Sequence, residues 1–277
     1  MIFHLGTHEP SWLANPLFAD VSLFVARQRF ERCKRRLPRA VGSWCLDSGG
    51  FTELQKHGRW TVTPREYVAE VRRFRDEIGG LLWAAPQDWM CEPWVLSGGR
   101  PPGSRECFAG TYLTVVEHLR RTVENFVELK SLAPDLPFVP VLQGWTLGDY
   151  IDCAELYERA GVVLVEEKLV GLGTVCRRQN TIRAGVIISE FSDRGIALHT
   201  FGLKTEGFRL YGHKVRSGDS LAWSDHAKHQ PPIDGHEKPG PGRPRGHKHC
   251  NNCPEFALEW RGRVLEAGCS SPKIDLR

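Results

Sequence analysis

Four polar side chains stand at or beside the ends of short apolar segments: Asp47, Asp88, Gln143 and Asp219. Taken singly, each is most simply explained by a structural hydrogen bond, and Asp47 by an Asx-type turn that closes a strand. Taken together, carboxylates, an amide and nearby glycines suit base exchange at an N-glycosidic bond. One carboxylate would attack the sugar carbon and form a covalent intermediate, which a second base then displaces. Another would move protons on the leaving and entering bases.

A second group of residues has the spacing of metal ligands. The segment His247-Lys-His-Cys250-Asn-Asn-Cys253 contains a C-x-x-C pair with histidines shortly before it. Thiolates together with imidazole at this spacing suit structural zinc. We predict His247, Cys250 and Cys253 as ligands, with His236 as the first choice for the fourth. His249 and Cys269 are the alternatives for that fourth position.

The elements that would position these groups alternate between strands and helices. Short apolar or β-branched runs predict strands at residues 2–5, 41–46, 81–86, 138–142, 162–165, 197–201 and 220–224. Longer amphipathic stretches predict helices at residues 63–78, 112–132, 147–160, 179–194 and 256–266. The first of these helices begins with an N-cap, a proline and a capping-box glutamate at Thr63-Pro64-Arg65-Glu66. Such alternation indicates parallel strands with crossover helices.

Two α/β architectures fit this alternation, a doubly wound sheet and a closed barrel. The doubly wound dinucleotide-binding fold needs G-x-G-x-x-G after its first strand, and the sequence has no such turn. In a barrel, the carboxyl ends of all strands meet at one face, where active sites are built. Because the polar candidates fall near strand ends, we predict a single (β/α)8 TIM-type barrel over residues 1–277. A zinc-binding loop and helix occupy about residues 230–267.

Several motifs together resemble the tRNA-guanine transglycosylase superfamily, which includes queuine tRNA-ribosyltransferases, and especially its DNA-modifying 7-deazaguanine branch. The similarity covers roughly residues 40 to 265, with the motifs in the same order along the chain. The motifs are Asp47-Ser-Gly-Gly-Phe51, Asp88 before Cys91-Glu-Pro93, Gln143-Gly144, Val170-Gly-Leu-Gly173 and Asp219.

The resemblance implies a role for each matching residue. Asp219 would be the covalent nucleophile and Asp47 the general base of a pentosyltransferase. The residues expected to bind the substrate base are Asp88, Gln143, Gly144, Gly171, Gly173 and Gly202. The cofactor would be a structural Zn²⁺. The substrates would be a nucleic acid and a free 7-deazaguanine such as 7-cyano-7-deazaguanine.

The polymer could be DNA or tRNA, and three features favour DNA. The zinc spacing departs from the C-x-C-x-x-C and distant histidine of the tRNA enzymes, no appended RNA-binding domain is visible after the zinc helix, and residues 6–10 resemble the start of the DNA branch. The third possibility is a non-catalytic, nucleic-acid-binding partner subunit. The presence of both Asp47 and Asp219 argues against it. Helper proteins and a homodimer are left open.

Composition sets outer bounds on this interpretation. The chain has 277 residues, of which 41% are hydrophobic and 25% charged, as expected for one globular domain with a core. It has no apolar run of about eighteen residues and no signal-peptide start, so we expect a cytoplasmic protein without a membrane span. Nine cysteines without framework spacing argue against a disulfide scaffold.

The net charge of +4 does not by itself identify a nucleic-acid-binding protein. Its distribution is more informative, because residues 27–39 and 238–249 are rich in basic side chains. We expect the first segment to contact a nucleic-acid backbone, with a solvated helix face as the alternative. Tryptophans near strand ends are candidates for stacking on a base, although packing is the commoner role: Trp89, Trp94, Trp145 and Trp223.

Overall fold

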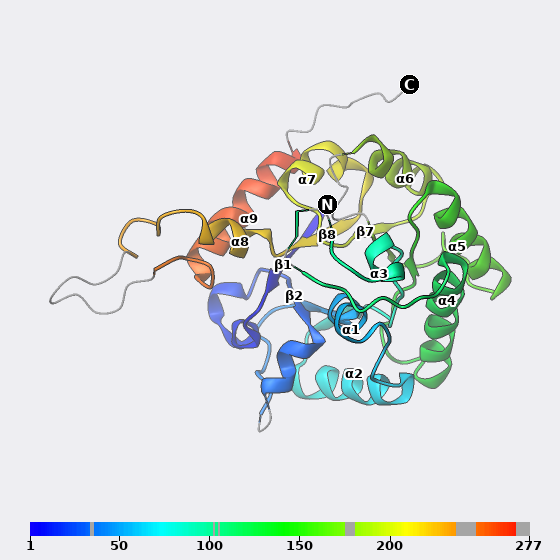
Figure 1. Ribbon diagram of the computed structural model, residues 1–277. Coiled ribbons are helices and arrows are strands. Elements are labelled where there is room, and N and C mark those ends of the chain that lie inside the picture. Colours follow the sequence, from blue (N-terminus) through cyan, green and yellow to red (C-terminus); the bar gives the residue numbers. More distant parts are fainter. Residues whose placement is uncertain (34–35, 102, 105, 175–180, 237–247, 270–277) are drawn as a thin grey trace.

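The computed structural model describes residues 1–33, 36–101, 103–104, 106–174, 181–236 and 248–269. Eight strands form one sheet in the order β4-β3-β2-β1-β8-β7-β6-β5, and all paired neighbours run parallel. The strands are β1 (Ile2–Thr7), β2 (Leu23–Ala26), β3 (Trp44–Asp47), β4 (Leu81–Ala84), β5 (Val141–Leu142), β6 (Val170–Leu172), β7 (Leu198–Thr200) and β8 (Ser217–Ser220). Figure 1 looks along the axis around which this sheet curls.

The two edges of the sheet meet through a short parallel bridge. Ala84 of β4 pairs with Phe138, which precedes β5. The Ala84 N–H donates to the carbonyl of Pro137 at 3.0 Å, and the Val139 N–H donates to the carbonyl of Ala84 at 3.2 Å. The pairing is this short because Pro137 on one strand and Pro86 on the other have no N–H with which to extend the ladder. The predicted barrel with parallel strands and interleaved helices is thereby confirmed.

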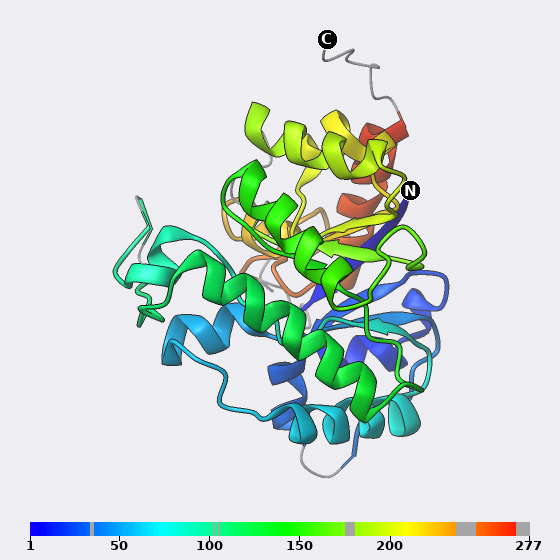
Figure 2. The same cartoon turned by 90° about the vertical axis from the view of Figure 1, so that its right-hand side faces the viewer.

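Helices surround the sheet on its outer side, as Figures 1 and 2 show. They are α1 (Gly50–His57), α2 (Pro64–Ile78), α3 (Pro93–Ser97), α4 (Val115–Leu132), α5 (Leu147–Arg159), α6 (Ile182–Asp193), α7 (Thr205–Tyr211), α8 (Ala222–Lys228) and α9 (Pro254–Cys269). Four 3₁₀ segments occur in the described residues: η1 (Pro10–Ala14), η2 (Pro16–Phe18), η3 (Arg27–Arg32) and η4 (Gly212–Lys214). No helix among the described residues is both long and apolar enough to cross a membrane.

Helix α2 illustrates how local sequence produces these elements. The Thr63 side chain accepts from the Glu66 N–H at 3.3 Å, and the Glu66 carboxylate accepts from the Thr63 N–H at 2.8 Å. This is the predicted capping box, which satisfies N–H groups that a helix start leaves unpaired. Tyr67, Val71 and Phe74 follow at helical spacing and are buried against the barrel.

Two of the strand predictions need correction, and one strand was missed. Residues 162–165 form no strand, since Val163 and Val165 are exposed and only Leu164 is buried. The sixth strand is instead β6, whose Val-Gly-Leu sequence lacks a β-branched run. Residues 220–224 are not a strand either, because β8 ends at Ser220 and α8 begins at Ala222. Strand β2 is absent from the predictions, since four apolar residues alone do not distinguish strand from helix.

The inside of the barrel holds aromatic and imidazole rings below its carboxyl end. Phe24, Cys45 and Trp83 belong to one buried cluster there, with Phe201 packed against it. The ring of His199 lies 4.6 Å from that of Trp83 and 4.8 Å from that of Phe201, centroid to centroid. These side chains fill the interior beneath the carboxyl ends of the strands, the face at which barrel active sites are built.

Candidate active site and metal centre

The predicted catalytic residues gather at the carboxyl end of the barrel. Asp47 is the last residue of β3, Asp219 lies within β8, and Gln143 directly follows β5. Asp88 lies in the loop after β4, and its Oδ1 is 3.5 Å from where a Cβ on Gly50 would stand. Because all strands run in the same direction, their carboxyl ends share one face. Figure 1 is viewed from this face, with α1 and α3 in front of the strands.

Asp219 is held by contacts to one of its two carboxylate oxygens. Its side chain is 9% exposed. Its Oδ1 accepts from the Gly202 N–H at 3.0 Å and lies 3.3 Å from Nε2 of His199. Gly202 has a φ of +65°, in the left-handed region that favours glycine. Both contacts go to Oδ1 and neither goes to Oδ2. Burial raises the pKa of Asp219 to about 7.

His199, which the sequence analysis did not select, lies beneath Asp219. Burial lowers the pKa of His199 to about 3, so its ring is neutral. A neutral imidazole has one N–H. The Ser217 hydroxyl lies 2.9 Å from Nδ1 and can donate to that nitrogen; in this tautomer the ring proton is on Nε2, which faces Asp219. A histidine inside an apolar predicted strand is the sequence signal that could have identified it.

Asp47 is part of a tight turn and also part of the acidic cluster. Its Oδ1 accepts from the Gly49 N–H at 2.8 Å, and Gly49 has a φ of +82°. Asp47 therefore forms the expected Asx-type turn and also lies at the carboxyl end of β3. The pKa of Asp47 is raised to about 6, mainly by burial and also by the charge of Asp219, while the Gly49 N–H and the charges of Arg27 and Arg29 oppose the rise.

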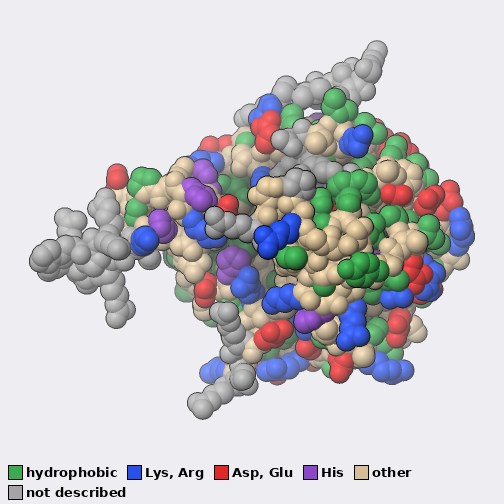
Figure 3. Space-filling model, viewed as in Figure 1, with side chains coloured by type: hydrophobic (Ala, Val, Ile, Leu, Met, Phe, Trp, Pro, Cys, Tyr) green, Lys and Arg blue, Asp and Glu red, His purple; other side chains and the backbone are tan. Residues whose placement is uncertain are grey.

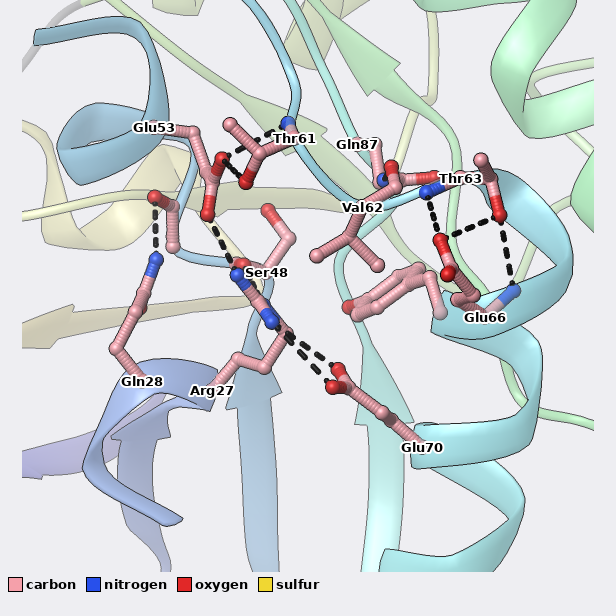
Figure 4. A network of polar contacts seen from close by, with 12 residues as sticks. Arg27, Gln28, Ser48, Glu53, Thr61, Val62, Thr63, Glu66, Glu70 and Gln87 are labelled. Atoms are coloured by element: carbon pink, nitrogen blue, oxygen red, sulfur yellow. Dashed lines mark hydrogen bonds and ion pairs between the residues drawn. The ribbon is translucent and has the colours of Figure 1, made fainter. Parts of the chain in front are cut away.

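A contact between residues 27–39 and a nucleic-acid backbone requires exposed basic side chains, but Arg27 is buried. Its side chain is 4% exposed and pairs with Glu53 at 2.6 Å and Glu70 at 3.2 Å. Its Nε also donates to the carbonyl of Ser48 at 3.3 Å. Figure 4 shows this network beside the Asp47 turn. For Arg27 the predicted contact with a nucleic-acid backbone is therefore wrong, because its N–H groups already donate to Glu53, Glu70 and the Ser48 carbonyl. Lys34 and Arg35 of the same segment lie outside the described residues.

Asp88 is oriented by a chain of side-chain hydrogen bonds. Gln143 donates from Nε2 to Oδ2 of Asp88, and its Oε1 accepts from the Thr174 hydroxyl at 2.6 Å. Thr174 also contacts the buried carboxylate of Glu92 at 3.3 Å. The pKa of Asp88 is raised to about 7, mainly by burial and also by the charges of Asp47 and Glu92, although the bond from Gln143 opposes the rise. Thr174 and Glu92 were not among the predicted site residues.

The predicted glycines are required by close packing in this region. A Cβ on Gly173 would lie 2.2 Å from Nε2 of Gln143, so only glycine allows the amide its position. A Cβ on Gly171 would meet the Phe201 ring at 2.6 Å, and one on Gly144 would meet the Tyr150 ring at 2.8 Å. A direct contact of these glycines with a base stays a prediction.

Of the four tryptophans considered for stacking, two are packed within the protein. Trp223 is 1% exposed and donates to the Gly6 carbonyl at 2.8 Å. Trp89 is 7% exposed, with the Arg121 guanidinium 4.8 Å from its ring centroid. Packing is therefore the role of both. Trp94 and Trp145 are half-buried and meet edge to face at 5.9 Å, so they remain candidates.

A separate cluster before α9 has the chemistry of a metal site. Nδ1 of His236 lies 3.4 Å from Sγ of Cys253 and 3.9 Å from Sγ of Cys250. A tetrahedral zinc with ordinary bond lengths would separate such atoms by about 3.6 Å. The three ligand atoms lie within 4.8 Å of one another, and Nε2 of His236 is 2.6 Å from a Glu255 carboxylate oxygen. These residues therefore fit a metal ion with an orienting carboxylate behind its histidine.

The fourth metal ligand is not identified by these residues. His247, which we predicted as a ligand, lies outside the described residues, and so does the side chain of the alternative Cys269. Within the described part, Nδ1 of His249 is buried without a hydrogen-bond partner. The predicted cluster is thus confirmed for His236, Cys250 and Cys253 as residues that could hold a metal.

Comparison with known proteins agrees with this arrangement. A protein-family model described as "DpdA: DeoxyPurine in DNA protein A" matches residues 1–275, which is nearly the whole chain. No curated protein matches the sequence.

Proposed function

We propose that this chain, which belongs to the DpdA family, exchanges guanine in DNA for a free 7-deazaguanine, such as 7-cyano-7-deazaguanine. The family is related to the tRNA-guanine transglycosylases, and membership in it implies insertion of a deazapurine into DNA. The proposal is carried by one observation. Asp47 is electrostatically coupled to both Asp219 and Asp88 at the carboxyl end of the barrel. Three interacting carboxylates at one place can divide nucleophilic, proton-transfer and recognition roles.

In the first displacement, Asp219 attacks the deoxyribose. Its Oδ2 forms a bond to C1′ while the bond from C1′ to N9 of guanine breaks, and the electron pair leaves with the base. Asp47 in its acid form gives a proton to the departing base. A pKa near 6 suits this role, since both protonation states are then accessible near neutral pH.

In the second displacement, the ionised Asp47 takes the N9 proton of the incoming 7-deazaguanine. N9 attacks C1′, and the bond between C1′ and Oδ2 breaks, which regenerates the Asp219 carboxylate. Two inversions at C1′ give overall retention. Asp47 ends in the acid form in which it began, so protons and charges balance over the cycle.

Base selection falls to Asp88 and the groups that orient it. The ionised Asp88 can accept from the ring N–H and the exocyclic amine of guanine or a 7-deazaguanine. Gln143 supports the ionised form by donating to Oδ2. The target guanine must leave the DNA stack to reach Asp88 and Asp219, so unpaired or locally melted DNA should react faster than intact duplex.

The metal in this proposal is zinc, held by His236, Cys250 and Cys253 with a fourth ligand. Zinc bound here supplies folding free energy to the segment that precedes α9. Ser224 of α8 donates to the carbonyl of Asn251 at 2.7 Å, which links this segment to the helix that follows β8. The role of the cluster is therefore structural.

The test is incorporation of a labelled 7-deazaguanine into DNA and tRNA in separate reactions, with candidate helper proteins supplied in parallel. We expect label in DNA. Asp219→Asn should abolish exchange and remove any protein–DNA adduct trapped by denaturation. Asp152→Asn, an exposed carboxylate on α5, is the matched control and should exchange at the normal rate. Label in tRNA alone, or a folded Asp219→Asn variant with near-normal turnover, would overturn the proposal.

A further inference from the structure

Three basic side chains stand close together at the carboxyl end of the barrel, outside the carboxylate cluster. His8 directly follows β1, Arg29 lies in η3 after β2, and Lys228 ends α8, which follows β8. Strands β8, β1 and β2 are neighbours in the sheet, so the segments that follow them emerge side by side. Figure 3, viewed from the same face as Figure 1, shows Lys, Arg and His side chains gathered on this part of the surface.

Arg29 is held in this place by its neighbours in the chain. Gln28 donates to the carbonyl of Gly49 at 2.9 Å, and Arg27 donates to the carbonyl of Ser48 at 3.3 Å. Figure 4 shows both side chains reaching the turn that follows Asp47. The backbone on the N-terminal side of Arg29 is thus fixed to the catalytic turn. Arg29 itself is half-buried and makes no hydrogen bond or ion pair with any residue that the structure describes.

The charge of Arg29 acts on both sides of its position. It lowers the pKa of Asp47, the proposed general base, and it lowers the pKa of His8. Arg29 is therefore close enough to act on both Asp47 and His8. Its guanidinium has five N–H donors in a planar fork, which matches the geometry of a phosphate.

His8 adds a ring with an enclosed and unpartnered nitrogen. Its Nδ1 is buried without a hydrogen-bond partner in the described part of the chain. Burial, then the charges of Arg29 and Lys228, lower the pKa of His8 to about 4, so the ring is neutral near pH 7. Lys228 is half-exposed, and its nearest carboxylate, Asp225, lies 3.5 Å away in the same helix. Positive groups this close together are stabilised by an anion between them.

We propose that His8, Arg29 and Lys228 bind a phosphodiester group of the DNA strand next to the target nucleotide. The proposal rests on the proposed function, because it places the strand that carries the reacting deoxyribose. Three carboxylates at the centre of the site repel a polyanion, so the backbone needs cations at the rim to approach. Such contacts fix the position of the strand without reading its sequence.

The experiment measures binding of a single-stranded oligonucleotide with one guanine, over a range of salt concentrations, without the incoming base. Arg29→Gln and His8→Ala should each weaken binding about tenfold. Loss of one phosphate contact should reduce the slope of log K against log salt by about 0.7 for Arg29→Gln. The control is Lys130→Gln, since Lys130 lines a cavity with Ile2 and Arg216 at the opposite end of the barrel. It should bind as the wild type does.

Affinity for the free base separates a phosphate contact from general damage to the site. It should be unchanged in Arg29→Gln and His8→Ala, and Arg29→Lys should recover part of the DNA binding. The proposal fails if Arg29→Gln binds DNA with the affinity and salt slope of the wild type, or if it loses base and DNA affinity together. Failure of the proposed function looks different, because the wild-type protein would then bind DNA and never incorporate a labelled base.

Discussion

The ring of His199 contacts Asp219 from inside the barrel, with Nε2 3.3 Å from Oδ1 of the carboxylate. Because the Gly202 N–H binds the same oxygen, the two contacts together orient the carboxylate and leave free of both the Oδ2 atom that attacks in the proposed mechanism. His199 is thus a positioning residue, and its effect on the reaction passes through Asp219.

We predict that His199→Phe lowers kcat about 10- to 100-fold and leaves DNA affinity unchanged. A phenyl ring fits among Trp83 and Phe201 but donates no hydrogen bond, so the ionised form of Asp219 loses support. The acid limb of the pH–kcat profile should move to higher pH, which a merely structural role would not cause. The control is His4→Phe, because His4 is also buried in the barrel but bonds to Ser22. An unshifted profile with normal kcat would contradict the assignment.

Exchange activity should rise from pH 5 to a maximum near about pH 7 and fall again above about pH 8, because Asp47, with a pKa of about 6, must hold a proton for the first displacement. The pKa values of Asp219 and Asp88 are each raised to about 7, mainly by burial. At lower pH both carboxyls hold protons, so Asp219 cannot attack and Asp88 cannot accept from the base edge. Initial rates at saturating DNA, measured across this range, check the prediction. A rate that is constant from pH 5 to 8 would argue against both roles.

Asp219→Asn should stabilise the protein at pH 8 and change its stability little at pH 4. The pKa of Asp219 rises from 3.8 to about 7 on folding, so between these values the folded state holds a proton that the unfolded state has lost. The free energy of unfolding therefore falls as pH rises through this window. Asparagine carries no titratable proton, so the Asp219→Asn variant does not lose this part of the free energy of unfolding at high pH. Thermal melting of both proteins at the two pH values tests it, and Asp152→Asn should show no such pH-dependent gain.

Thr174→Val should weaken affinity for the free base about tenfold, with a smaller effect on kcat. The hydroxyl donates to Oε1 of Gln143 and so directs the amide N–H of Gln143 toward Asp88. Loss of a buried partner costs about 1–3 kcal/mol. Thr200→Val is the control, since the buried Thr200 hydroxyl has no hydrogen-bond partner among the residues that the structure describes. Equal base affinities for the two variants would remove Thr174 from base recognition.

Purified protein should contain one zinc per chain, and chelation should lower its melting temperature. Cys253→Ser should lose the metal and the stability together, because ligand binding and local folding are coupled. Glu255→Gln should weaken zinc affinity about 10- to 100-fold while the fold is kept, since Glu255 only orients His236. Metal analysis that finds no zinc in a protein of unchanged melting temperature would exclude the site.

Local patterns in the sequence determined much of this protein. The Thr63–Glu66 capping box, the polar residues after apolar strands and the Cys250–Cys253 pair all depend on residues a few positions apart. Such patterns are readable because hydrogen bonds at a helix start and the chemistry of a metal ligand act over short stretches of chain. Alternation of strands and helices then indicated parallel strands, since these require crossovers, and the polar residues near strand ends favoured the barrel over a doubly wound sheet.

Only the tertiary structure decided which polar groups meet. Thr174 bonds to Gln143, Gln143 to Asp88, and His199 to Asp219, each across strands that the sequence does not align. The buried pairing of Arg27 with Glu53 likewise turned an expected nucleic-acid contact into a support for the catalytic turn. These outcomes depend on burial and on distances between segments far apart in the chain. Periodicity and spacing carry no information on either, because they describe one segment at a time.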